Sequence, residues 1–213
     1  MRKLPVVPYT YEQLQDMARP QFVNRPEGIP WVYFDTVPTV LATPTVLTFF
    51  QTLQTNKSLG NMDLAGMLTS GEYFIIDSIG LDILTPPTVT AAGSAPVGAL
   101  SDVYEILNGD AVTGGDSGRW SFNMLSKAIG PFPLSFLHAS GGPTGNGWGT
   151  ETTATTSQYA NNGIFDGGFP MGNLVIPPST TFNVTLEWGG ATTLVAERAL
   201  RVWMFGTKYR PVR

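Results

Sequence analysis

The chain has 213 residues, of which 42% are apolar, 13% are charged and none is cysteine, and its formal net charge is −4. This apolar share excludes a wholly disordered chain, and the lack of cysteine excludes disulfides, thiolate metal sites and a cysteine nucleophile. The many turn residues, 24 Gly and 17 Pro, favour one all-β domain with long loops.

Residues 1–43 are predicted to form an extended N-terminal arm. Six prolines interrupt regular structure in this segment. One short helix is expected from Tyr11 to Ala18, with a capping box at its start and Pro20 after its end. The run from Trp31 to Phe34 is too apolar for a free tail, so we expect it to lie on the body or on a neighbouring subunit. Prolines also interrupt any signal-peptide pattern, and no apolar run is long enough to cross a bilayer, which predicts a soluble, unprocessed protein.

The remaining residues, 44–213, are predicted to form one domain that starts with two strands. The first, residues 44–53, has apolar residues on both faces, so we expect both faces to be covered. Residues 72–84 are the longest strand candidate, and a short helical segment is expected after it at 100–107. The drier face of that longest strand is predicted to carry Tyr73, Ile75, Ile79, Leu81 and Ile83.

The second half of the domain continues the strand pattern. Strands are expected at 118–125, 173–176, 180–188 and 198–209, with a proline-edged apolar stretch at 131–139. The clearest is 180–188, where apolar Phe182, Val184, Leu186 and Trp188 alternate with polar residues. Residues 140–169 form a long Gly-rich loop, and loops of this length are usually functional. About eight strands without an internal repeat predict an eight-stranded antiparallel β-sandwich of jelly-roll type.

One motif resembles part of a catalytic site, and one histidine is of a type that binds metals. Gly115-Asp116-Ser117-Gly118 copies the sequence around the nucleophile of chymotrypsin-like proteases, but the only histidine, His138, follows the serine instead of preceding it. A single histidine also cannot form a histidine-based metal cluster. We interpret the motif as a turn before a strand.

Other polar groups suggest chemistry less strongly. Oxygens of Asn108, Asp110 and Asp116 match no strict calcium pattern, and a solvated turn is the simpler interpretation. Asp77 and Asp82 are a possible acid–base pair, although a hydrogen-bonded or interface carboxylate explains them equally well. The Gly-rich residues 141–149 lack the following helix of a phosphate-binding loop. We therefore predict no enzyme, no cofactor and no metal.

Charge is distributed unevenly along the chain. Nine of the twelve basic residues lie within residues 1–25 and 198–213, whereas the middle holds three basic and fourteen acidic residues. Charged ends that keep the protein soluble are the simplest explanation. The alternative is contact with an anionic partner such as a genome or an internal membrane, for which the candidates are Arg2, Lys3, Lys208, Arg210 and Arg213.

Aromatic residues exceed what a two-sheet core needs. Because aromatic residues are enriched at protein–protein contacts, we predict an assembly interface between copies of the chain. Its candidate residues are Trp31, Tyr33, Phe34, Trp148, Tyr159, Phe165, Phe169, Trp203 and Phe205. The alternative is that the aromatic residues of the long loop stack on sugar rings, as in a carbohydrate-binding β-sandwich or a receptor-binding virion protein.

The order of elements resembles single jelly-roll major capsid proteins, especially those of tailless icosahedral, often lipid-containing bacteriophages. The resemblance covers roughly residues 40–210 and rests on the Pro-rich arm, the first two strands with the helix after them, and the closing sequences 176–184 (IPPSTTFNV) and 200–206 (LRVWMFG). The jelly-roll domains of vertex and spike-base proteins of virions resemble this sequence in the same way. The resemblance implies a virion structural protein, made in the host cytoplasm, that self-assembles with its arm on a neighbour and has no catalytic residue or small-molecule substrate.

Overall fold

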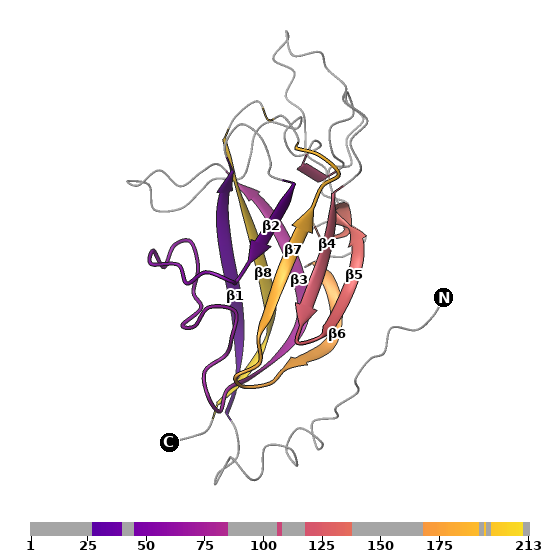
Figure 1. The fold of residues 1–213 in the computed structure, drawn as a ribbon. Coiled ribbons are helices and arrows are strands. Elements are labelled where there is room, and N and C mark those ends of the chain that lie inside the picture. Colours follow the sequence, from indigo (N-terminus) through magenta and orange to yellow (C-terminus); the bar gives the residue numbers. More distant parts are fainter. Residues whose placement is uncertain are drawn as a thin grey trace, which may run out of the picture.

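The computed structural model describes residues 27–39, 45–84, 106–107, 118–137, 168–191, 194 and 197–210. This part of the chain is all-β, with two antiparallel four-stranded sheets and almost no helix (Figure 1). The elements are β1 (Glu27–Thr39), β2 (Val46–Phe49), β3 (Tyr73–Leu84), β4 (Arg119–Met124), β5 (Lys127–Pro133), the 3-10 turn η1 (Leu134–Phe136), β6 (Phe169–Ile176), β7 (Phe182–Glu187) and β8 (Arg198–Arg210). The helix predicted at 11–18 lies outside the described residues, and of the one predicted at 100–107 only Ile106 and Leu107 are described, both helical.

The strand order is β1-β8-β3-β6 in one sheet and β2-β7-β4-β5 in the other. Pairing is nested: β1 pairs with β8, β2 with β7, β3 with β6 and β4 with β5. Two further pairings, β3 with β8 and β4 with β7, complete the sheets. This is the pairing of one long antiparallel hairpin, with its turn between β4 and β5, wound so that its strand pairs fall alternately in the two sheets.

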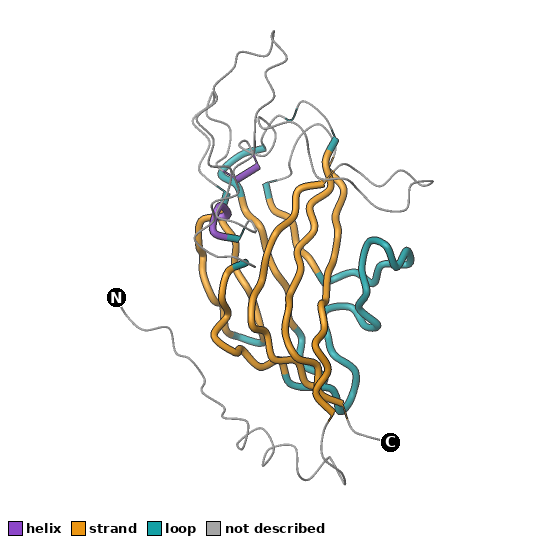
Figure 2. Tube along the Cα trace, turned by 180° about the vertical axis from the view of Figure 1, so that it is seen from behind, coloured by secondary structure: helices purple, strands orange, loops and turns teal. Residues whose placement is uncertain are grey.

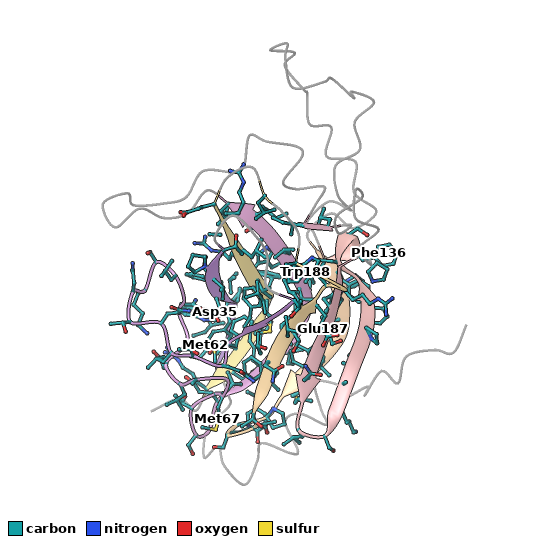
Figure 3. The ribbon with its side chains drawn as sticks, turned by 45° about the horizontal axis from the view of Figure 1, so that its top comes forward. Asp35, Met62, Met67, Phe136, Glu187 and Trp188 are labelled. Carbon is teal, nitrogen blue, oxygen red and sulfur yellow. The ribbon has the colours of Figure 1, made fainter. Side chains whose placement is uncertain are left out.

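The two sheets share one hydrophobic core, and Figure 3 shows the side chains that fill the space between them. In β7, Phe182, Val184 and Leu186 are buried, while Glu187 and the preceding Thr181 are exposed, so the alternation predicted there is confirmed. In β8, the buried residues Leu200, Val202 and Met204 alternate with outward-facing ones in the same way.

The predicted dry face of β3 is wrong in its first half. The register shifts between Ile76 and Ser78 against both neighbouring strands. Before this bulge Phe74 and Ile76 enter the main core, whereas Tyr73 and Ile75 belong to a small separate cluster on the other side of the sheet. An inserted residue reverses the alternation, and the predicted face is correct again after the bulge.

The predicted boundary at residue 43 between arm and body is also wrong. Strand β1 pairs with β8 from Glu27 to Thr39, so the body includes residues that were predicted to belong to the arm. Pro30 and Pro38 are tolerated because β1 is an edge strand, where one side of the backbone has no partner strand. Residues 1–26 lie outside the described part of the chain.

The loop between β2 and β3 covers the open edge of β1 (Figure 2). The Phe34 N–H donates to Asn61 Oδ1 at 2.9 Å, and Asn61 Nδ2 donates to the Val32 carbonyl. Asp35, which is 3% exposed, accepts a hydrogen bond from the Phe50 N–H at 2.6 Å (Figure 3). The backbone groups of Val32 and Phe34 that the loop occupies are therefore not available to a strand of another molecule.

Candidate functional site

The outer side of the β1-β8-β3-β6 sheet is unusually apolar. We call it the apolar face and define it by Val32 and Phe34 of β1 and Trp203 and Phe205 of β8. Val32 and Phe205 are 40% and 43% exposed, and the other two are half-buried. The small cluster of Tyr73, Ile75, Val175 and Tyr209 continues it along the sheet. A sheet with one face in the core normally has polar residues on the other face, so this face needs an explanation.

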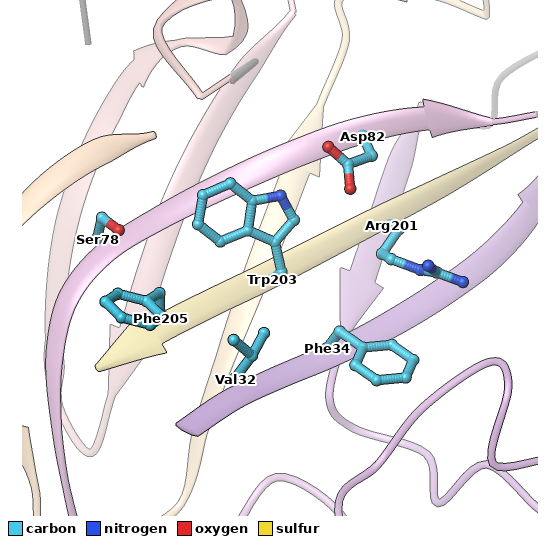
Figure 4. A pocket seen from close by; sticks show the side chains of 7 residues that line it. All are labelled: Val32, Phe34, Ser78, Asp82, Arg201, Trp203 and Phe205. Carbon is cyan, nitrogen blue, oxygen red and sulfur yellow. The ribbon is translucent and has the colours of Figure 1, made fainter. Parts of the chain in front are cut away.

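The apolar face contains a shallow hollow of about 450 Å³ (Figure 4). Seven residues from β1, β3 and β8 line it: Val32, Phe34, Ser78, Asp82, Arg201, Trp203 and Phe205. The Trp203 indole lies against β3 where Gly80 has no side chain, since a Cβ there would overlap the ring. A Cβ at Gly168 would lie 2.7 Å from the same ring. Two glycines therefore allow the indole to lie close to the sheet and leave the hollow open.

Two charged residues line the hollow, and one of them is fully engaged within the chain. Arg201 donates from Nε to Thr36 Oγ1 at 2.9 Å and from Nη2 to the Ser58 carbonyl at 3.1 Å. Its guanidinium also lies 4.9 Å from the centre of the Phe34 ring. Asp82 is opposite Arg201 in the β3–β8 register and is half-buried. The hollow thus combines a mostly apolar lining with one carboxylate.

The outer side of β4 and β7, the two central strands of the other sheet, is polar, and we call it the polar face. All outward residues of β4 and β7 are polar: Arg119, Ser121, Asn123, Asn183, Thr185 and Glu187. Asn123 Nδ2 donates to Asn183 Oδ1 at 2.9 Å and to Thr185 Oγ1 at 3.1 Å. This face has the composition expected of a sheet surface in contact with water.

The structure brings together three of the nine aromatic residues predicted at an interface, namely Phe34, Trp203 and Phe205. Trp31 is 40% exposed and lies on the same strand, 6.3 Å from the Tyr33 ring. Trp148, Tyr159 and Phe165 lie outside the described residues.

Two of the predicted interface residues pack inside their own chain. Tyr33 is 3% exposed and its ring packs edge-on against Phe74 at 4.9 Å, because the strand pleat turns it away from Val32 and Phe34. Phe169 begins β6 and is not part of a loop; its ring lies 5.1 Å from Trp120 and 5.2 Å from Phe132. Both side chains contribute to the fold.

Lys208, predicted to contact an anionic partner, is neutralised within the chain. Its Nζ lies 2.9 Å from Glu72 Oε1, and the two side chains are only 13% and 17% exposed. Burial by itself lowers the pKa of Lys208, but hydrogen bonds with Glu72 and Tyr33 outweigh it and the pKa is raised. Burial raises the pKa of Tyr33, and Lys208 opposes that shift. Of the other predicted contacts, Arg210 is exposed, whereas Arg2, Lys3 and Arg213 lie outside the described residues.

The candidate catalytic and metal residues do not form a described cluster. Asp77 lies at the β3 bulge and is largely exposed. The burial of a small part of its side chain raises the pKa of its carboxyl group. Within the described residues, no three His, Cys, Asp or Glu side chains gather in a way that suits a metal ion. Gly118 is buried just before β4, but the rest of its motif, His138, Asn108, Asp110 and the Gly-rich residues 141–149 lie outside the described part of the chain.

The sequence contained a signal for the aromatic half of the hollow but not for its polar half. Trp203 and Phe205 follow from the alternation in β8, whereas Ser78 and Asp82 join them only through the register between β3 and β8.

None of the helices in the described segments is long and apolar enough to span a membrane. Comparison with protein-family models, with curated proteins and with solved structures gave no match.

Proposed function

We propose that the chain is a virion structural protein that self-assembles into an icosahedral capsid shell. The observation that carries this proposal is the apolar face, which the monomer leaves open to solvent. Contiguous exposed apolar residues often mark protein–protein contacts, and interfaces between identical subunits are more apolar than ordinary surface. A surface that copies of the molecule cover for one another explains why these side chains are present.

The strand pairing supports the finer architecture. In a jelly roll, eight strands form two sheets by winding one long hairpin, and the nested pairing of β1 with β8 through β4 with β5 is what that winding requires. Jelly rolls serve in viral capsids and also in lectins, so the fold alone does not decide between these functions. The apolar face favours the capsid.

The sheet edges support assembly through faces and loops instead of strand pairing. The loop after β2 covers β1, and β2 has only four residues. Strand β5 contains Pro131 and Pro133, and β6 has positive φ angles at Gly172 and Asn173. Each of these features blocks edge-to-edge pairing. The predicted arm contact is now confined to residues 1–26, because β1 belongs to the body.

One observation favours a second candidate function, a carbohydrate-binding β-sandwich. The hollow places the Trp203 indole near the Asp82 carboxylate, and an aromatic ring beside a hydrogen-bond acceptor suits a sugar. Arg201, however, is already hydrogen-bonded within the chain, which leaves few polar groups for such a ligand.

The experiment that tests the proposal is electron microscopy and light scattering of the purified full-length chain over a range of concentration and salt. We expect closed particles or rings, and we expect a chain that lacks residues 1–26 to fold but to assemble at higher concentration. A full-length chain that stays monomeric throughout would contradict the capsid proposal. Saturable binding of a glycan by that monomer, lost on Trp203→Ala, would favour the second candidate.

A further inference from the structure

We propose that the apolar face binds the same face of a second copy, in a two-fold symmetric contact in which Phe205 of each copy enters the hollow of the other. This inference rests on the proposed self-assembly and names the surface that mediates its first step. A two-fold contact requires one patch to be complementary to itself, so the patch must hold both a projection and a recess. The apolar face holds both, since Phe205 and Val32 are exposed and line the hollow together with the half-buried Trp203.

The sheet that bears the apolar face is large enough for a stable contact between two proteins. Strands β1 and β8 each have 13 residues, which corresponds to a length of about 43 Å at about 3.3 Å per residue. Four strands about 4.8 Å apart give the sheet a width of roughly 15 to 19 Å. The whole outer side of this sheet, of which the apolar face is a part, therefore measures on the order of 700 Å² per copy, close to the roughly 800 Å² that each partner buries in a standard interface.

The charge on the face permits two copies to approach. The whole chain has a net charge of −4, which disfavours association of identical molecules. The lining of the hollow, by contrast, contains one acidic and one basic side chain, Asp82 and Arg201. The lining of the hollow is thus neutral, and pairing two hollows brings no excess of like charge together.

The rest of the described surface offers no better partner for the apolar face. The outward residues of β4 and β7 are polar throughout. The other exposed large apolar residues are Trp31, Val46, Leu53, Leu64, Leu125 and Phe136, and none of them lines the hollow. They lie on β1, on β2, on the β2–β3 loop, in the β4–β5 turn and on η1. Among the described residues, the apolar face is therefore matched best by itself.

The first test compares a charge placed on each face of the full-length chain. Phe205→Glu is expected to raise the dissociation constant of the dimer by about 100-fold or more, because it places a carboxylate in an apolar recess of the partner. Ser121→Glu, on a central strand of the polar face, is the matched control and should change it less than about threefold. Analytical ultracentrifugation measures both constants, and circular dichroism shows whether each variant is folded.

The second test uses the absence of native cysteine. A single cysteine at Val32 should be cross-linked into dimers by a short bismaleimide, whereas a single cysteine at Ser121 should not. If the Phe205→Glu variant folds and associates as wild type does, or if Val32→Cys gives no dimer, the face-to-face contact is wrong even where particles form. If removal of residues 1–26 is needed before Val32→Cys reacts, that segment covers the face and the inference is overturned. A wild-type chain that never associates overturns both the inference and the proposed function.

Discussion

The two sheets share one core and have the same number of strands, yet their outer faces differ in kind. On the polar face, Asn123, Asn183 and Thr185 hydrogen-bond to one another at the surface. On the apolar face, the equivalent outward positions hold Trp203 and Phe205. A sheet needs only one apolar face to pack against its partner. The fold of the monomer therefore accounts for the polar face, whereas the core does not require the apolar face, which is why we propose a contact outside the monomer for it.

The largest change in stability is expected where charge is buried in the sheet that bears the apolar face. Lys208→Met leaves Glu72 largely buried without its partner and should lower the free energy of unfolding by about 3 kcal/mol. The control is Lys57→Met, because Lys57 lies 3.8 Å from Asp63 with both side chains more than half exposed. Lys57→Met should lower the free energy of unfolding by less than about 1 kcal/mol. Urea unfolding measures both, and equal losses would show that the Lys208–Glu72 pair behaves as a surface pair.

An intermediate effect is expected from filling the space beneath Trp203. The methyl group of Gly80→Ala would overlap the indole and displace it from β3, at a cost of about 2 kcal/mol. Gly190→Ala is the control, since a Cβ there meets nothing within 4 Å. Urea unfolding of the two variants should separate them clearly. A Gly80→Ala protein as stable as wild type would mean that the indole does not depend on this glycine for its position.

The smallest effect is expected on the polar face. Thr185→Val removes the hydroxyl that accepts from Asn123 and donates to Asn183, but water replaces these partners at the surface. The free energy of unfolding should fall by less than about 1 kcal/mol, and association should not change. Urea unfolding and sedimentation test the two halves of this prediction. A marked loss of association would place an interface on the polar face and remove the distinction between the two faces.

Regular alternation made part of the fold predictable. Strands β4, β7 and β8 keep an unbroken period of two, so their inward residues, such as Trp120, Val184 and Val202, follow from the sequence. The bulge of β3 interrupts that period, and its only mark in the sequence is the charged Asp77 on a face that is otherwise apolar. Bulges depend on how two strands pair, which is not a local property.

Prolines account for most of what was missed. Pro30 and Pro38 suggested an arm because proline disrupts a central strand, yet β1 lies at an edge. Pro131 and Pro133 similarly concealed β5, another edge strand. The aromatic half of the hollow could be predicted from β8 alone. Its polar half required the register between strands that are about 120 residues apart in the chain, as Asp82 and Arg201 are.

The place of β8 also determines when the apolar face comes into existence during synthesis. Strand β8 lies between β1 and β3, and it supplies Trp203 and Phe205, so neither the sheet nor its outer surface is complete until the last strand has left the ribosome. A nascent chain therefore lacks the surface through which finished molecules would meet. Under the proposed contact, two nascent chains on one messenger RNA cannot pair through this face before β8 has been made.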